Sequence, residues 1–285
     1  MLQAKTPKLT IGMCCYDDFD GVYFTIQALR MYHPICSTDE VEFIVVDNKP
    51  DGAHGLTVKN FVNGWVKGAY IPYTEKKSTS IRNEIFKHAK GEYTLCIDCH
   101  VMIESGGITA LMEYYANNPD TNNLVQGPLW YDDLKNYSTH FDTVWRDNMY
   151  GIWDTNVPSY KEGLPFEIPM QGLGLFSCKT DKWLGFSDKF RGFGGEEGYI
   201  HEKFRQNGGK CVCLPNLKWM HRFNRPDGIK YPLDLNDRIW NYIIGGMELY
   251  KDETHPFMLS VKEHFKDKIS DKLYHNYIEL AKSNI

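Results

Sequence analysis

The tripeptide Asp98-Cys99-His100 places a carboxylate and an imidazole two residues apart, directly after an apolar run at residues 93–97. If the backbone stays extended, the side chains of Asp98 and His100 leave the same face of the chain. Ligands of open α/β sheets bind outside the carboxyl ends of the strands, which is where this pair would lie. One oxygen and one imidazole nitrogen suit Mn²⁺ or another borderline divalent ion better than Ca²⁺, which prefers oxygen ligands only. A triplet this short also arises by chance. Further residues are therefore needed to predict a metal site.

The chain before this tripeptide alternates between strand and helix patterns. Apolar runs predict strands at residues 9–14, 41–47, 69–73 and 93–97, and apolar residues at helical spacing predict helices at 22–32, 58–65 and 80–90. This alternation favours an α/β fold with a mixed, mostly parallel sheet and right-handed crossovers. Two of these strands end in an aspartate, Asp47 and Asp98, so two carboxylates should face the same edge of the sheet.

The middle of the chain is less regular. Residues 124–130 predict one further strand, and residues 131–165 then gather tryptophan and tyrosine without clear periodicity. A long irregular segment in a compact domain is more often functional than not. The alternative is an insertion that only packs its aromatic side chains on the sheet.

Two glycine-rich stretches carry further candidate residues. Gly172 and Gly174 interrupt a strand pattern at residues 169–177, where a ligand could approach the backbone closely. A second glycine-rich loop opens a helix whose first residues are Glu196 and Glu197. The helix dipole alone also favours acidic residues in a first turn, so a structural role for this pair stays open.

The end of the chain is predicted to be helical. Helical patterns cover residues 235–250 and 272–282. We therefore expect one domain over residues 1–225 and a helical C-terminal extension, residues 226–285, packed on that domain.

Composition limits the classes of function. The formal net charge is −5 and the pI is near 6.1, which gives no overall field for a polyanion. The first residues lack the apolar stretch of a signal peptide and no run of about 18 apolar residues occurs. We expect a soluble protein without a membrane partner, located in the cytoplasm, or in the host cytoplasm if the chain is encoded by a phage.

The eight cysteines mostly lie in apolar runs, as reduced thiols do.

Taken together, four ordered segments resemble the nucleotide-sugar glycosyltransferases of GT-A fold, family-2-like, and most closely the catalytic domain of polypeptide N-acetylgalactosaminyltransferases. The first is a Ser-Ile-Arg-Asn helix that leads through Gly-Glu-Tyr to Asp98-Cys99-His100. The others are Met-Gln-Gly-Leu-Gly-Leu-Phe-Ser at 170–177, Phe-Gly-Gly-Glu-Glu at 193–197, and His221. The resemblance spans about residues 9–225.

This resemblance implies a GT-A, Rossmann-like fold with flanking helices and a metal-dependent transfer of a sugar. The donor would be a nucleotide-diphosphate sugar, such as a UDP-sugar, and the acceptor a hydroxyl group. The metal, Mn²⁺ or Mg²⁺, would be held by Asp98, His100 and His221. The residues that would contact the donor are Cys14, Cys15, Tyr16, Asp47, Arg82, Asp98, Gly172 and Gly174, with Asp47 on the nucleobase. Glu196 and Glu197 would be the catalytic carboxylates.

The sequence differs from these relatives at the start of the helix that begins with Glu196. In the relatives, the residues at this position differ between enzymes that invert and enzymes that retain the configuration of the transferred sugar. Inverting family-2 enzymes carry Glu-Asp at this helix start and the retaining N-acetylgalactosaminyltransferases carry Glu-Asn, whereas this chain has Glu196-Glu197. A carboxylate at Glu197 could serve as a base. Because the neighbouring glycines resemble the retaining group, inversion and retention both stay open. Phe193 replaces the tryptophan of the relatives.

Several alternatives stay open. The acceptor could be a protein, a glycan or a hydroxymethylated base in DNA, as for phage-type DNA glycosyltransferases; DNA would require a local basic patch. A non-catalytic module that binds sugar nucleotides or carbohydrates through the aromatic segment is a second class. A zinc or thiol-redox protein that uses Cys96 and Cys99 is a third. The sequence does not predict the oligomeric state.

Overall fold

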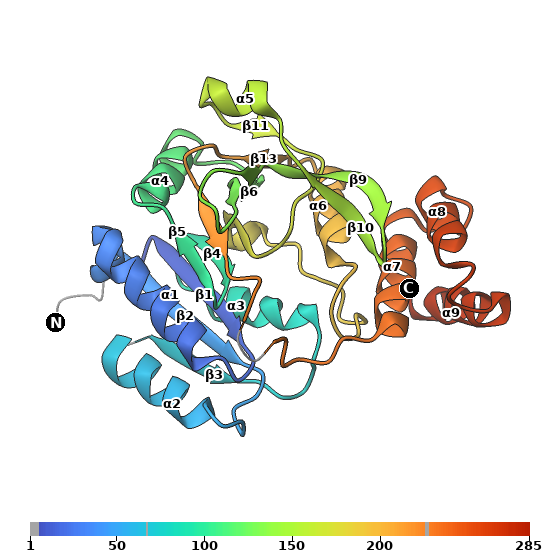
Figure 1. Cartoon of the computed structure of the whole chain (residues 1–285), viewed down its shortest axis with the longest axis horizontal. Coiled ribbons are helices and arrows are strands. Elements are labelled where there is room, and N and C mark those ends of the chain that lie inside the picture. Colours follow the sequence, from blue (N-terminus) through green and yellow to red (C-terminus); the bar gives the residue numbers. More distant parts are fainter. Residues whose placement is uncertain (1–5, 67, 226–227) are drawn as a thin grey trace.

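The computed structural model describes residues 6–66, 68–225 and 228–285, and its centre is an eight-stranded sheet (Figure 1). Across this sheet the strands are β11 (Phe166–Glu167), β13 (Cys211–Cys213), β6 (Leu124–Gln126), β12 (Leu175–Lys179), β4 (Tyr93–Asp98), β1 (Leu9–Cys15), β2 (Val41–Asp47) and β3 (Ala69–Pro72). β12 and β11 run against the other strands of the sheet. The predicted α/β class and mixed, mostly parallel sheet are confirmed.

Helices cover both faces of this sheet. The α-helices are α1 (Phe19–Tyr32), α2 (Gly55–Asn60), α3 (Arg82–His88), α4 (Gly107–Asn117), α5 (Val157–Glu162), α6 (Glu196–Gln206), α7 (Leu235–Tyr250), α8 (Pro256–Phe265) and α9 (Asp271–Asn284). Short 3₁₀ or π turns lie at Pro34–Ser37, Phe61–Val66, Thr79–Ile81 and Thr180–Lys182. α1, α2 and α4 lie on one face, and α3, α6 and α7 on the other (Figure 1).

The central strands are apolar on both sides because both of their faces are covered. In β2, Phe43 and Val45 belong to the core under α1, α2 and α4, whereas Ile44 and Val46 belong to the core under α3, α6 and α7. Gly12 in β1 is needed for close packing, because a Cβ atom there would overlap the side chain of Ile85 in α3. α3 therefore lies directly on the backbone of β1.

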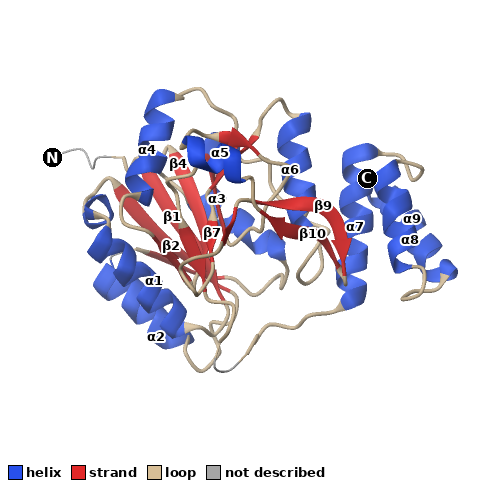
Figure 2. Ribbon diagram, turned by 45° about the horizontal axis from the view of Figure 1, so that its top comes forward, coloured by secondary structure: helices blue, strands red, loops and turns tan. Residues whose placement is uncertain are grey.

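Two smaller sheets extend the central one. β5 (Val101–Ile103), β14 (Trp219–His221), β7 (Leu129–Trp130) and β8 (Tyr137–Ser138) form a four-stranded sheet. β9 (His140–Arg146) and β10 (Met149–Asp154) form an antiparallel ribbon that reaches α6 and α7 (Figure 2).

Two predictions for this region were wrong. The strand at 124–130 is two strands of different sheets, since a Cβ atom at Gly127 would overlap the carbonyl of Leu217, and this close approach turns the chain out of the central sheet. Residues 131–165 are not irregular, because they contain the β9–β10 ribbon and α5. Their periodicity is hidden because the ribbon has aromatic residues on both faces, with Phe141 against Trp153 and Trp145 against Tyr150.

Among the C-terminal helices, α7 packs on α6, and α8 and α9 pack on α7. α7 coincides with the predicted helix at 235–250, and α9 covers the one at 272–282. α8, which buries Met258, Val261 and Phe265, was not predicted. The expected boundary between residues 225 and 226 falls beside residues 226–227, outside the described residues, so the division into a domain and an extension stays a prediction. No helix among the described residues is long and apolar enough to cross a lipid bilayer.

The side chain of Asn83 in α3 forms hydrogen bonds with Trp183 and Phe186, in the segment that leads to α6. Its Oδ1 accepts hydrogen bonds from Trp183 Nε1 at 3.1 Å and from Phe186 N at 2.9 Å, and its Nδ2 donates to Phe186 O at 3.0 Å. Trp183 also stacks on Phe86 of α3, with 4.1 Å between the ring centroids.

We expect Asn83→Ala to lower the free energy of unfolding by roughly 2–3 kcal/mol, because it leaves part-buried hydrogen-bonding groups of Trp183 and Phe186 without partners. Urea denaturation measures the change. Lys87→Ala on the exposed side of α3 is the control and should change it by less than about 0.5 kcal/mol. An Asn83 variant as stable as the control would contradict this role.

Candidate functional site

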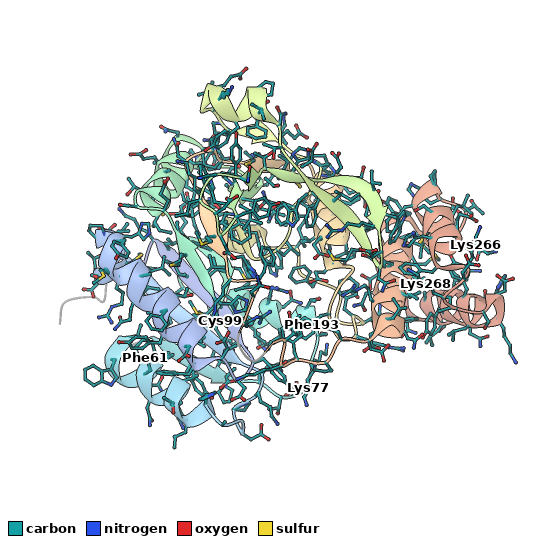
Figure 3. All side chains as sticks on the ribbon, in the orientation of Figure 1. Phe61, Lys77, Cys99, Phe193, Lys266 and Lys268 are labelled. Carbon is teal, nitrogen blue, oxygen red and sulfur yellow. The ribbon has the colours of Figure 1, made fainter. Side chains whose placement is uncertain are left out.

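A cavity of about 220 Å³ lies at the carboxyl edge of the central sheet. The strand ends meet there in register, Cys15 opposite Asp47 and Cys14 opposite Asp98. The predicted site residues that line the cavity are Cys14, Cys15, Tyr16, Arg82, Asp98 and His100. Cys99 and Phe193, both labelled in Figure 3, line it as well.

Asp98, His100 and His221 come together at this edge, with one ligand atom of each within 4.8 Å of the others. β14 pairs antiparallel with β5, which sets His221 beside Val101 and so beside the end of β4. His221 Nε2 lies 3.3 Å from Asp98 Oδ2, and the two imidazole rings have centroids 4.8 Å apart. A carboxylate and two imidazoles form a donor set that suits Mn²⁺ and other borderline divalent ions.

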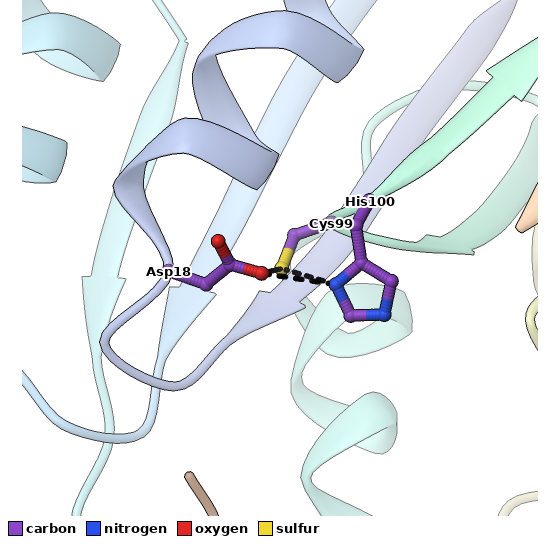
Figure 4. Close-up of side chains that lie close together, drawn as sticks. All are labelled: Asp18, Cys99 and His100. Carbon is purple, nitrogen blue, oxygen red and sulfur yellow. Dashed lines mark hydrogen bonds and ion pairs between the residues drawn. The ribbon is translucent and has the colours of Figure 1, made fainter. Parts of the chain in front are cut away.

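Asp18 orients His100 and was missed by the sequence analysis. Its Oδ2 lies 3.0 Å from His100 Nδ1, and its Oδ1 caps α1 by accepting from Gly21 N at 3.0 Å (Figure 4). Burial acts to raise the pKa of Asp18, but the bonds from His100 and Gly21 outweigh it and lower the pKa to about 2. This contact leaves Nε2 of His100 for a ligand, and metal-binding histidines usually make such a bond to a carboxylate.

A second grouping, Asp18, Cys99 and His100, could also be considered for a metal (Figure 4). Cys99 Sγ lies 3.7 Å from Asp18 Oδ2 and 3.6 Å from His100 Nδ1. A cysteine binds metal as the thiolate. Contact with the Cys15 thiol, together with burial, raises the pKa of Cys99 well above its usual value, which keeps the thiol protonated. The Asp98, His100 and His221 set therefore fits a divalent ion better.

Arg82 connects Asp98 to the start of α6. Its Nη2 lies 3.1 Å from Asp98 Oδ1, and its Nη1 lies 3.7 Å from Glu196 Oε1. Burial acts to raise the pKa of Asp98, but the Arg82 guanidinium and the bond from His221 hold that pKa well below its usual range. Asp98 is thus a carboxylate at any physiological pH.

Glu196 and Glu197 open α6 after two glycines that have positive φ, Gly194 at 102° and Gly195 at 92°. Glu196 is 5% exposed and its Oε2 is buried without a hydrogen-bond partner. Burial and the neighbouring Glu197 raise the pKa of Glu196 to about 8, and burial raises the pKa of Glu197 as well. Arg238 of α7 opposes both shifts, a contact that no local sequence pattern indicates.

Asp47 lies at the predicted edge, but it does not line the cavity. Its carboxylate is 1% exposed and accepts from Lys49 N at 2.9 Å and from Tyr70 Oη at 2.8 Å. The next residue, Asn48, lines the cavity in its place. A contact between Asp47 and a nucleobase stays a prediction.

The strand predicted at residues 169–177 begins only at Leu175, so Gly172 and Gly174 lie before β12, and both glycines are explained by packing. A Cβ atom at Gly172 would lie 3.0 Å from the ring of Trp153, and one at Gly174 would lie 2.8 Å from the ring of Trp219. Gly174 also accepts the backbone hydrogen bond from Asp98 N at 2.9 Å, which places it beside the candidate metal ligands. Their contact with a donor sugar stays a prediction.

The segment after β14 contributes cations that were not among the predicted site residues. Arg222, Arg225 and Lys230 line the cavity, and Lys230 Nζ donates to Asp17 O at 2.9 Å. Tyr231 packs on Phe193, with 4.3 Å between the ring centroids. The described part of this segment therefore forms a wall of the cavity close to Asp17, just after the end of β1.

The comparisons with known proteins identify the family of this fold. Residues 10–177 match the profile of Glycosyl transferase family 2, which is more than half of the chain, and the chain belongs to this family. It is therefore a glycosyltransferase. No curated protein sequence matches the chain.

Solved structures share the fold at low sequence identity. A structure of GalNAc-T7 with UDP, GalNAc and Mn²⁺ is 15% identical with a TM-score of 0.71, covering 99% of this chain and 57% of that chain. TarS of S. aureus with UDP-GlcNAc is 12% identical with a TM-score of 0.60, covering 96% and 80%. The mannosyltransferase PcManGT of Pyrobaculum calidifontis with GDP-Man and Mn²⁺ is 13% identical with a TM-score of 0.57, covering 98% and 76%. This chain thus spans little more than half the length of the GalNAc-T7 chain.

Glu196→Gln should flatten the dependence of stability on pH between about pH 5 and pH 8. The folded state holds the Glu196 proton up to a pKa of about 8, whereas the unfolded chain releases it near ~4.3. Stability therefore falls as the pH rises through this window, by at most ~1.4 kcal/mol per pH unit for one proton. Glutamine has no such proton, so the loss should disappear.

Urea denaturation at both ends of this window measures the effect. Glu113→Gln, an exposed change on α4, should keep the wild-type slope. If Glu196→Gln also kept that slope, Glu196 would not be protonated in the folded state.

Proposed function

We propose that this chain transfers a sugar from a UDP-sugar to a hydroxyl acceptor with the aid of Mn²⁺ or Mg²⁺. The observation that carries the proposal is the convergence of Asp98, His100 and His221 beside a cavity lined by cationic side chains. Structures with the same fold bind UDP with Mn²⁺, UDP-GlcNAc, and GDP-Man with Mn²⁺. UDP is preferred because two of these three structures hold a uridine nucleotide.

The charges of the cavity suit a diphosphate. Arg222, Arg225 and Lys230 approach it from the segment after β14, and guanidinium groups pair with phosphate oxygens in bidentate fashion. The metal, held by the aspartate and the two histidines, would supply Lewis-acid stabilisation of the diphosphate leaving group. Asp18 would keep the His100 ring in the orientation that a ligand needs.

The remaining residues would bind and orient the donor. Cys14, Cys15 and Tyr16 line the cavity where β1 ends, beside the expected nucleoside. Cys14 would act by packing, because burial raises its thiol pKa to about 12. Arg82 would hold Asp98 ionised and in place.

Glu196 and Glu197 would act on the sugar and the acceptor. Glu196, protonated up to a pKa of about 8, can donate a hydrogen bond through its otherwise unpartnered Oε2. Glu197 would take the proton of the acceptor hydroxyl if the reaction inverts, and its raised pKa makes it a stronger base than an exposed carboxylate. If the reaction retains configuration, Glu197 has only a positioning role.

Nucleotide binding tests the proposal. With Mn²⁺ present, UDP should raise the melting temperature more than CDP or GDP, and the increase should disappear without the metal. Asp98→Ala should abolish the increase, because it removes a metal ligand and leaves Arg82 with one carboxylate fewer. The matched control is Asp39→Ala in the exposed turn before β2, which should keep the wild-type response.

Two results would count against the proposal. One is the absence of stabilisation by any of these nucleotides with Mn²⁺. The other is equal stabilisation of the wild type and Asp98→Ala, which would place the nucleotide elsewhere.

A further inference from the structure

A second cavity, of about 420 Å³, lies between the β9–β10 ribbon and helices α6, α7 and α8. None of the predicted site residues lines it. Its walls are largely aromatic, formed by Trp145, Tyr150, Tyr242, Tyr250 and Phe257. A cavity of this size and lining is typical of sites for small organic ligands.

One end of this cavity is polar. Glu202 and Arg205 of α6 line it, and Arg205 Nε donates to Glu202 Oε2 at 2.9 Å. Tyr150 and Tyr250 line the same cavity. A carboxylate, a guanidinium and two phenol groups are thus among the groups that a ligand in this cavity could contact.

Gly198 helps to keep the chamber open. It lies inside α6, where glycine costs about 1 kcal/mol relative to alanine. Packing does not require glycine there, because a Cβ atom would meet Tyr150 Cδ1 at 3.5 Å and Met170 Sδ at 3.7 Å, which are ordinary contacts. Its missing side chain instead enlarges the space beside Glu202.

The two cavities flank the loop that carries the paired carboxylates. Phe193 lines the first cavity, and Gly195, the residue before α6, lines the second. Glu196 and Glu197 follow directly and form the first turn of α6. A molecule that occupies the second cavity would therefore lie beside the backbone of Gly195, directly before these carboxylates.

We propose that the second cavity binds a sugar ring of the acceptor, so that the acceptor of this glycosyltransferase is a neutral glycan. This inference rests on the proposed function. The faces of aromatic rings pack on the C–H faces of a pyranose. The Glu202–Arg205 pair offers charged acceptors and donors to neighbouring hydroxyl groups. A polyanion such as DNA does not fit, since Glu202 offsets Arg205 at this end and the whole chain has a net charge of −5.

The test is glycan binding by the full chain, without nucleotide or Mn²⁺, to an array of neutral oligosaccharides, followed by calorimetry with one oligosaccharide that binds. We expect binding to oligosaccharides that share one terminal ring. Glu202→Gln, which keeps the shape of the side chain, and Tyr250→Ala should each weaken the affinity at least tenfold. Thr143→Trp, an exposed change on β9 at the cavity wall, should abolish binding by filling the space.

Three controls separate the possible causes. Tyr32→Ala removes an exposed tyrosine on α1 and should bind as the wild type does. Asp98→Ala should also keep glycan binding while it loses nucleotide binding. Thermal melts show whether each variant is folded, and if Tyr250→Ala is not, the isosteric Glu202→Gln decides.

Other outcomes would overturn the inference. These are no binding to any oligosaccharide, equal binding by Thr143→Trp and the wild type, or displacement of the glycan by an oligonucleotide or a peptide that binds more tightly. If UDP binds with Mn²⁺ but no glycan binds, only this inference falls. If glycans bind but no nucleotide does, the proposed transferase site falls and the cavity is a carbohydrate-binding site without a role as acceptor site.

Discussion

The buried guanidinium of Arg82 is the interaction on which the arrangement of the site depends. Its side chain is 12% exposed and lies between Asp98 at the end of β4 and Glu196 at the start of α6. A charge in such a place is stable only when it is paired, and removing one partner leaves an unpaired buried ion. The carboxylate of Asp98 meets this requirement, and the protonated carboxyl group of Glu196 lies beside the same guanidinium, so Arg82 joins the sheet edge to the start of α6. The position of Arg82 also depends on Gly12, which lets α3 lie close to β1.

The parallel half of the fold could be predicted because its strands are apolar on both faces and its helices keep a regular spacing. Asp98 and His100 followed from the same pattern, and His221 followed from its place in the order of motifs. Asp18 could not be assigned to His100, because the two residues are 82 positions apart and meet only when α1 packs beside the end of β4. The β9–β10 ribbon was missed because aromatic residues on both faces conceal its alternation.

The two cavities differ in the charge of the side chains that line them. Arginine and lysine side chains line the first cavity beside a candidate metal site. Aromatic rings line the second cavity together with the Glu202–Arg205 ion pair, whose two charges cancel. The first is lined by the ends of β1 and β4, inside the family match at residues 10–177, and by Arg222, Arg225 and Lys230 after β14, outside it. The second is lined by the β9–β10 ribbon, which lies inside the family match at residues 10–177, and by α6, α7 and α8, which lie outside it. The proposed donor site could thus be drawn in part from sequence motifs, whereas the proposed acceptor site emerged only from the structure.

The central claim is that a divalent ion binds to Asp98, His100 and His221. Its most direct test is a crystal structure with Mn²⁺ and UDP, with data recorded at the manganese absorption edge to locate the ion by its anomalous signal. The account predicts one strong anomalous peak between the Asp98 carboxylate and the two imidazoles, next to the diphosphate. A peak at Asp18, Cys99 and His100, or nucleotide bound without any ion at these residues, would contradict it.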